Sequence, residues 1–191
     1  MFLYKLVYRV YNYFYNQVLL NVFKVTHGDN LRIQGRIFIR NKGKINIGEN
    51  VKIKSGMRYN PIGCEVNTRL VAYRGGEIII GNNVGISNSI LISRSKVQIE
   101  DHVLIGNGCK IWDNDFHSLA VDKRHSVDES LIKSSQIVIK KNAFIGGCSI
   151  ILKGVTIGED SIIGAGSVVS KDIPDNEIWA GNPIRFIKKI N

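Results

Sequence analysis

The chain has 191 residues, 44% of them hydrophobic, and a formal net charge of +10. That is enough apolar material for a substantial core in one elongated domain, so no second domain is required. The charge favours phosphate-bearing ligands, anionic polysaccharide or acidic lipid; nucleic acid is not expected as a partner, because no recognition helix, zinc site or aromatic-basic sheet motif accompanies it.

Residues 1–26 predict an amphipathic helix, because apolar residues recur at helical spacing and polar ones gather on the opposite face. The apolar set is Leu3, Leu6, Val7, Val10, Phe14, Val18, Val22 and Val25, and the polar set is Lys5, Arg9, Asn12 and Asn16. No apolar run approaches the length that spans a bilayer. Residues 1–25 are expected either to pack on the domain or on a sister subunit, or to attach reversibly to the inner membrane surface.

A six-residue period dominates the C-terminal third of the chain. Aliphatic residues occupy every sixth position at Ile139, Ile145, Ile151, Ile157, Ile163 and Val169. This period suits neither a helix nor one face of a strand, and it is typical of hexapeptide β-helix repeats. Three units close one triangular coil, so residues eighteen apart, such as Ile139 and Ile157, should stack. Glycine follows the aliphatic residue at Gly146, Gly158 and Gly164, where turning a corner is expected to require backbone freedom.

The same period, with shifts of phase, runs through the earlier chain. It comprises Ile33, Ile39, Ile45, Ile47, Ile53, Ile80, Ile86, Ile92, Ile99, Ile105 and Ile111. We therefore predict an all-β fold, a parallel β-helix over residues 27–175 with a loop at 112–137. An ordinary β-sandwich with coincidental spacing is the alternative. Residues 176–191 are expected to form a basic tail, which is either a binding element or merely a solvated end.

The cysteines Cys64, Cys109 and Cys148 are odd in number and scattered, which argues against a disulfide framework and fits a reducing cytoplasm. Cys109 and Cys148 follow glycines within the repeats. They are interpreted as small residues in a crowded coil, with a reactive thiol as the alternative.

The interval from Ile111 to Ile139 is 28 residues, not a multiple of six, and it contains Asp113-Asn114-Asp115-Phe116-His117. Long excursions from a solenoid are usually functional, because they cost ordering entropy and add nothing to the stack. His117 is the candidate general base, since an imidazole can accept a proton from a hydroxyl or an amine. One of Asp113 and Asp115 is expected to orient the ring, and the other to cap the turn.

Three motifs together resemble the left-handed β-helix acyltransferases: the hexapeptide array, the segment Asp113 to His117, and the segment from Gly164 to Arg185. The resemblance covers about residues 30–190. It is closest to the O-acetyltransferases of capsule and lipopolysaccharide gene clusters, within the branch of galactoside, maltose and serine acetyltransferases. It implies a left-handed coil, a homotrimer with active sites between subunits, and acetyl-coenzyme A as cosubstrate.

The resemblance also implies residue roles. His117 aligns with the family's general base, and the backbone amide of Gly147 would hold the oxyanion. Asn88 stands where relatives place a residue that touches the acceptor. The residues expected to contact coenzyme A, from its pantetheine arm to its phosphates, are Ala165, Ser170, Lys171, Trp179, Arg185 and Lys188. For Trp179, a packing anchor for the tail is the open alternative.

The acceptor implied is a sugar hydroxyl in surface-polysaccharide assembly. Residues 1–25 are aromatic and basic where the galactoside and maltose enzymes carry a polar segment, so a lipid-linked or nucleotide-linked glycan at the cytoplasmic face of the membrane is favoured over a small free sugar. The alternatives are N-acetylation of a nucleotide-linked amino sugar and a non-catalytic scaffold. No metal is expected, because the four histidines lack the spacing of the γ-type carbonic anhydrases that share the fold.

Overall fold

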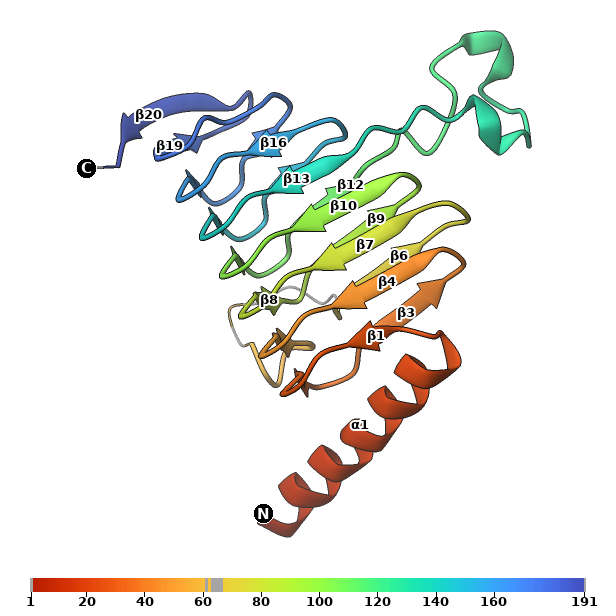
Figure 1. Ribbon diagram of the computed structural model, residues 1–191, viewed down its shortest axis with the longest axis vertical. Helices are drawn as coiled ribbons and strands as arrows, with labels where there is room; N and C mark the ends of the chain where they lie inside the picture. Colours follow the sequence, from red (N-terminus) through yellow and green to blue (C-terminus); the bar gives the residue numbers. More distant parts are fainter. Residues whose placement is uncertain (1, 61, 63–66, 191) are drawn as a thin grey trace.

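Three parallel sheets wind into a triangular prism in the computed structural model, which describes residues 2–60, 62 and 67–190 (Figure 1). Successive strands pass from sheet A to sheet B to sheet C and back to sheet A, so each coil adds one strand to each sheet. The predicted left-handed parallel β-helix is thereby confirmed. Cys64 and residues 1 and 191 lie outside the described residues.

The helix and strands have the following bounds. One helix, α1 (Phe2–Val22), precedes the coils. Sheet A contains β1 (Thr26–His27), β4 (Lys44–Ile47), β7 (Glu77–Ile80), β10 (Lys96–Ile99), β13 (Ile137–Ile139) and β16 (Thr156–Ile157). Sheet B contains β2 (Arg32–Gln34), β5 (Lys52–Lys54), β8 (Gly85–Ser87), β11 (Leu104–Ile105), β14 (Phe144–Ile145), β17 (Ile162–Ile163), β19 (Glu177–Ala180) and β20 (Arg185–Lys189). Sheet C contains β3 (Phe38–Asn41), β6 (Arg69–Ala72), β9 (Ile90–Ser93), β12 (Lys110–Trp112), β15 (Ile150–Ile151) and β18 (Val168–Val169).

Stacked aliphatic side chains fill the prism. Ile139 pairs with Ile157, Ile145 with Ile163, and Ile151 with Val169, so the predicted eighteen-residue stacking is confirmed. All six side chains are fully buried, and each contributes hydrophobic stabilisation while its backbone bonds the coils above and below. At one earlier position the expected phase is wrong. Leu91, and not Ile92, faces the core, since Leu91 is opposite Ile111 and Ile92 is opposite the outward Trp112.

The glycines after the core aliphatics are required by close approach of the next coil. None of Gly146, Gly158 and Gly164 has a φ in the left-handed region. A Cβ on Gly146 would lie 2.5 Å from the backbone nitrogen of Ala165, and one on Gly158 would lie 2.4 Å from that of Asp175. These positions therefore require glycine because a side chain would collide with the next coil, and not because of the backbone freedom that the sequence analysis expected.

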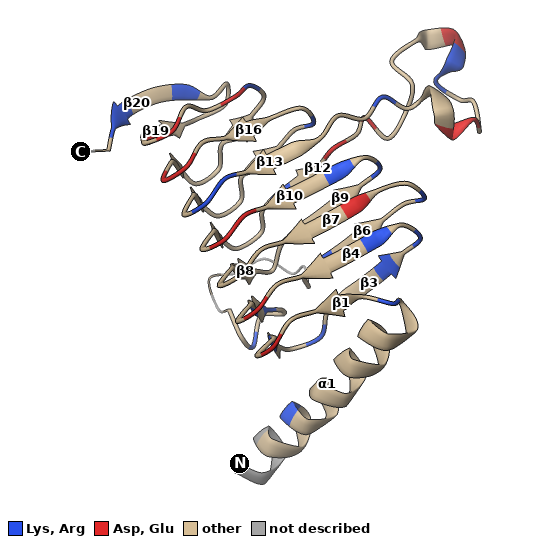
Figure 2. Cartoon of the chain, in the orientation of Figure 1, with Lys and Arg blue, Asp and Glu red and all other residues tan. Residues whose placement is uncertain are grey.

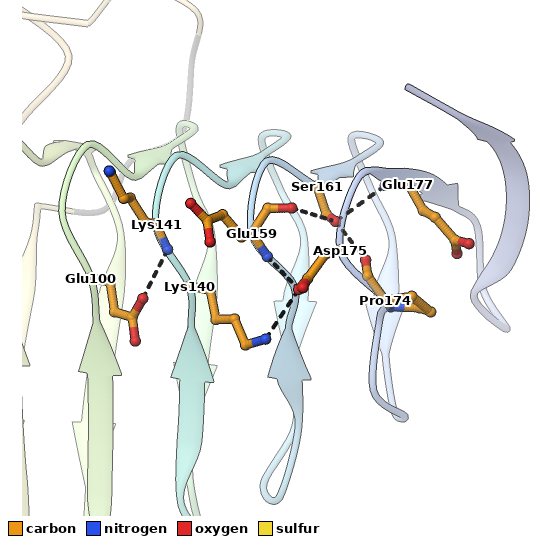
Figure 3. A network of polar contacts seen from close by, with 8 residues as sticks. All are labelled: Glu100, Lys140, Lys141, Glu159, Ser161, Pro174, Asp175 and Glu177. Carbon is orange, nitrogen blue, oxygen red and sulfur yellow. Dashed lines mark hydrogen bonds and ion pairs between the residues drawn. The ribbon is translucent and has the colours of Figure 1, made fainter. Parts of the chain in front are cut away.

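The prism has three corners, named here for the sheets that they join. At the A–B corner, side chains of one turn accept hydrogen bonds from backbone amides of the neighbouring turn (Figure 3). The amide of Lys141 donates to Glu100 Oε2 over 3.0 Å, and the amide of Glu159 donates to Asp175 Oδ1 over 2.8 Å. Lys140 Nζ lies 3.1 Å from the same Asp175 oxygen. These bonds satisfy turn amides that the sheets leave unpaired.

Helix α1 lies beside the first coil and its last turn closes that end of the core (Figure 1). Leu20 is buried in the core cluster, and Leu19 and Phe23 pack against it. The predicted helix is therefore present. The face that it turns towards the coils is the polar one, since Asn12 and Asn16 are each only 2% exposed.

The C-terminal residues form an ordered hairpin, where the sequence predicted a tail. Strand β19 continues sheet B in parallel with β17, and β20 returns antiparallel to β19. Trp179 is opposite Ile163 and packs against the end of the core cluster. The hairpin thus closes the prism at the end opposite α1.

Candidate active site

The excursion predicted from the broken period leaves the C–A corner between β12 and β13 (Figure 1). It contains two short 3-10 turns, Val121–Lys123 and Glu129–Leu131, and its tip is exposed throughout residues 119–130. At its base the two arms meet. Asn114 and Ser134 form an antiparallel bridge, and the amide of Ser135 donates to the carbonyl of Asp113 over 2.8 Å. The loop is therefore a closed projection with a fixed base.

Asp113 anchors that base and is fully buried. Its carboxylate accepts hydrogen bonds from Ser93 Oγ at 2.7 Å and from the amides of Arg94 and Ser95, each at 2.8 Å. Asn114 Nδ2 is a fourth donor, at 3.2 Å. Of the two aspartates considered for orienting His117, Asp113 is thus the one that caps a turn, and its oxygens are occupied.

Two ion pairs hold the loop to the coils on either side. Lys153, from the next turn at the C–A corner, places Nζ 2.8 Å from Asp115 Oδ1. Arg94, from the preceding turn, places Nη1 2.7 Å from Glu129 Oε2, and its guanidinium lies 4.0 Å from the ring centroid of Tyr73. Asp115 Oδ2 is buried and has no hydrogen-bond partner among the described residues. Asp115 therefore has one oxygen without a partner among the described residues, whereas both oxygens of Asp113 are bonded.

Arg94 and Lys153 were not singled out by the sequence. Each follows a sheet C strand and looks like an ordinary solvated cation in a turn. Their position in the sequence could have indicated them, because Arg94 and Lys153 lie in the turns directly before and after the one from which the loop departs.

His117 is exposed just beyond this anchored base. The preceding residue, Phe116, adopts a left-handed φ of +62° and donates its amide hydrogen bond to Asn114 Oδ1 at 3.0 Å. The Phe116 ring packs edge-to-face on Trp112, with centroids 5.6 Å apart. The hydrogen bond to Asn114 and the contact with Trp112 hold Phe116 in this strained conformation. Phe116 in turn fixes the backbone position of His117, whose side chain is exposed.

Gly147 and Ala165 lie at a different corner, B–C, in consecutive coils. The carbonyl of Gly147 accepts from the amide of Gly166 at 2.9 Å, while the amide of Cys148 donates to Asn107 over 2.7 Å. The N–H of Gly147 itself donates to no acceptor within the described ranges. An unpaired, half-exposed backbone donor of this kind suits an incoming oxyanion.

Asn88 also lies at the B–C corner, and the expectation that it touches an acceptor is corrected. It is fully buried, Oδ1 accepts from the amide of Gly56 at 2.6 Å, and Nδ2 donates to Asn107 Oδ1 at 2.7 Å. Its φ is +43°. Asn88 therefore joins consecutive turns, and the burial of its amide leaves nothing for a ligand to reach.

The C-terminal candidates divide into two groups. Ser170, Lys171, Arg185 and Lys188 are exposed, as residues that meet a charged ligand must be. Trp179 is a packing residue: it covers the end of the core, its Nε1 donates to Glu177 at 2.7 Å, and its ring meets Phe186 edge-to-face. Lys171 Nζ lies 5.0 Å from the Trp179 ring centroid. Of the two interpretations of Trp179, the packing anchor is the one that the geometry favours.

The candidates of one chain do not gather at one point. His117 and Asp115 belong to the C–A corner, whereas Gly147 and Ala165 belong to the B–C corner. A general base and an oxyanion donor at different corners of one prism cannot act on the same bond. They can do so if a neighbouring chain brings its own corner alongside.

The other chemistry-bearing residues do not form a second centre. Burial raises the pKa of the Cys109 thiol to about 11, so this cysteine is a packing residue with little thiolate. Among the described residues, no group of three or more His, Cys, Asp or Glu side chains is placed to hold a metal ion. Also within the described residues, no helix is long and apolar enough to cross a membrane.

Comparison with known proteins identifies the class. The family model "Bacterial transferase hexapeptide (six repeats)" matches residues 136–171. WbbJ of Escherichia coli (strain K12), provisionally named a lipopolysaccharide biosynthesis O-acetyl transferase, is 34% identical over 160 residues, which are 81% of this chain and 76% of WbbJ. The chain belongs to the hexapeptide-repeat transferase family.

Two further relatives place the chain within that family. Galactoside O-acetyltransferase of Escherichia coli (strain K12) is 38% identical over 117 residues, which are 58% of this chain. The chain spans only 56% of the length of that enzyme. A mutant of AntD, an N-acyltransferase from Bacillus cereus solved with dTDP and coenzyme A, superposes with a TM-score of 0.72 at 26% identity, covering 92% of this chain and 89% of AntD.

Proposed function

We propose that this protein is an acetyl-coenzyme A dependent O-acetyltransferase that acetylates a sugar hydroxyl in the assembly of a surface polysaccharide. The observation that carries the proposal is the exposed His117, set beyond an anchored loop base on a prism whose next corner offers the free N–H of Gly147. The kinship with WbbJ and with galactoside O-acetyltransferase supports a sugar as the acceptor.

His117 acts as the general base in the proposed mechanism. Its imidazole takes the proton of the acceptor hydroxyl while the oxygen attacks the thioester carbonyl. Asp115, through the oxygen that its ion pair with Lys153 leaves open, orients the ring and stabilises the imidazolium. Gly147 donates its N–H to the tetrahedral oxyanion, a contribution of about 3 kcal/mol for a rigid donor. The protonated His117 then supplies the proton that the departing thiolate takes up.

The binding of coenzyme A is assigned to the exposed candidates. Lys171, Arg185 and Lys188 carry the positive charges that the phosphates of coenzyme A require, at a rim open to water. Ala165 stands in the coil after Gly147, where the pantetheine arm would run past the oxyanion donor, and Ser170 would meet the adenosine end. No nucleophilic serine or cysteine is needed, because the acyl group passes directly between the two substrates.

A homotrimer is proposed as the working assembly. With His117 at the C–A corner and Gly147 at the B–C corner, a site is complete only where two chains adjoin. Three chains around an axis would form three such sites. We place the enzyme in the cytoplasm, to which its free cysteines Cys109 and Cys148 are suited, and at the inner face of the membrane, where lipid-linked or nucleotide-linked glycans are met.

A second candidate, N-acylation of a nucleotide-linked amino sugar, is kept because of the likeness to AntD. An amine could lose its proton to the same His117. Paired hydroxyl and amine versions of one nucleotide sugar separate the two candidates, since the proposed enzyme should release thiol only with the hydroxyl compound.

The test is thiol release from acetyl-coenzyme A across a panel of saccharides and nucleotide sugars, with His117→Asn and His125→Asn compared. Both histidines are exposed on the same loop, so the pair is matched. We expect His117→Asn to lower turnover by about 100-fold to 10,000-fold and His125→Asn to leave it near wild type. Undiminished turnover in His117→Asn would remove the proposed base.

A further inference from the structure

Helix α1 presents an apolar face to solvent, interrupted by the polar residues Gln17 and Asn21. Its members share one side of the helix and are between 46% and 64% exposed: Leu6, Val7, Val10, Phe14, Val18 and Val22. Tyr11 and Tyr13 flank this set and are more than half exposed. We call these eight residues the outer face of α1. An apolar stripe of this length on a protein surface marks a contact with a partner.

The opposite face of α1 is committed to the coils by polar bonds. Asn16 Nδ2 donates to the carbonyl of Gly35 at 2.8 Å, and Asn16 Oδ1 accepts from the amide of Ile37 at 3.3 Å. Arg36 Nε donates to Asn12 Oδ1 at 2.9 Å, and its guanidinium lies 5.2 Å from the ring centroid of Tyr15. Buried asparagines without these partners would be costly, so the bonds fix the rotation of the helix. The helix cannot turn its apolar face inward.

The charge around the helix points to an anionic partner. Residues 1–48 contain eight Lys and Arg against a single acidic residue, Asp29. Figure 2 shows no Asp or Glu residue along the described part of α1, while acidic residues recur at the A–B corner turns. Beside the helix, Tyr8, Arg9, Arg58 and Tyr59 line a hollow of about 380 Å³, which brings two guanidinium groups next to aromatic rings.

We propose that the outer face of α1 lies flat in the headgroup region of a bilayer that contains anionic lipid. Val, Leu and Phe side chains would enter the acyl boundary, and Tyr and Arg would meet the headgroups, the arrangement of an interfacial helix. A second copy of this chain is a poorer occupant, because the charged groups beside this face, Arg9, Arg36 and Arg58, are all basic and two such faces would repel each other. Anionic lipid supplies both the apolar layer and the missing negative charge.

The test is co-flotation of the full chain with vesicles of phosphatidylcholine alone or of phosphatidylcholine mixed with phosphatidylglycerol. The wild-type chain should float with the mixed vesicles and less with the neutral ones. A triple variant, Val10→Gln, Phe14→Gln and Val18→Gln, should bind at least about tenfold more weakly. The control replaces three apolar residues on the active-site loop that are even more exposed, Leu119, Val121 and Val127, with Gln and should float like the wild type.

A second variant separates charge from apolar contact. Arg9→Gln should lose about fivefold in binding to the mixed vesicles and nothing on the neutral ones, which corresponds to one basic residue near a charged surface. It also keeps the proposal testable if the triple variant melts early by circular dichroism. The assay contains no acetyl-coenzyme A and no acceptor, so its outcome is independent of the proposed acyl transfer.

Three results would overturn the proposal. One is failure of the wild-type chain to float with either vesicle. Another is flotation of the triple variant at the wild-type level. The third is a wild-type chain that does not bind lipid together with a triple variant whose oligomer dissociates, as measured by light scattering. The outer face would then belong to an interface between copies of this chain.

Discussion

The A–B corner and the C–A corner are made by the same coils and differ in what their side chains do. At the A–B corner, carboxylates such as Asp175 accept amide hydrogen bonds from the neighbouring turn and lock coil to coil. At the C–A corner, the same kind of group supports a projection: Asp113 ties down its base, and Arg94 and Lys153 clamp it from two sides. The comparison teaches that one solenoid can devote one edge to its own stability and another to a loop that adds none.

The largest effect on stability should come from the core that both corners share. Ile139→Ala removes a fully buried side chain stacked on Ile157 and should lower the free energy of unfolding by about 3 kcal/mol. Leu119→Ala, at an exposed position on the loop tip, should change it by less than about 0.5 kcal/mol. Urea unfolding of both variants measures the difference, and equal losses would mean that the loop tip is part of the cooperative core.

The next effect distinguishes the base of the loop from its tip. Asp113→Ala leaves the amides of Arg94 and Ser95 without their acceptor and should cost about 2 kcal/mol of unfolding free energy. Asp122→Ala, on an exposed 3-10 turn of the same loop, serves as the matched control and should be nearly neutral. If thermal melts of the two variants coincide, Asp113 does not anchor the loop.

The smallest effect concerns the clamp at the far arm of the loop. The hydrogen bond from Arg94 and its charge hold the pKa of Glu129 below its ordinary value. A carboxylate with a depressed folded-state pKa contributes stability above its unfolded pKa, and this contribution is lost as the pH falls through the folded-state pKa. The loop should therefore stay docked at neutral pH and loosen only in acid, below the ordinary carboxyl value of 4.5.

Amide hydrogen exchange across the loop at a series of pH values measures this clamp. Arg94→Gln should raise exchange at residues 126–132 at neutral pH, and Glu129→Gln should do the same and remove the part of the acid dependence that comes from Glu129. Asp128, whose pKa is lowered by its hydrogen bonds with Ser130, titrates in the same loop, and Asp128→Asn should leave the Glu129 transition in place. If neither the Arg94 nor the Glu129 substitution changes amide exchange in the loop, this ion pair does not hold the loop in place.

Much of the architecture was legible in the sequence. A period of six between Ile139 and Val169 can close only as a coil, because that spacing places an aliphatic side chain inside each face of a triangular turn. The broken period between Ile111 and Ile139 marked the loop, and His117 stood out within it as a side chain that can accept a proton from a hydroxyl. These are local or periodic facts, which a one-dimensional pattern records.

Tertiary structure alone decided how those parts are used. The sequence placed Asn12 and Asn16 on the polar face of an amphipathic helix, yet both are buried, and Asn16 bonds to backbone groups of Gly35 and Ile37 that no sequence pattern announces. The sequence did not distinguish the roles of Asp113 and Asp115. In the structure, amides of the preceding coil donate to Asp113, while Lys153 of the next coil forms an ion pair with Asp115. Asn88 and Trp179 likewise became structural because of what stacks against them. The physical reason is the same throughout: the period fixes which side chains point inward, but hydrogen-bond partners and charges come from neighbouring coils, whose turns vary in length and bring together residues far apart in the chain.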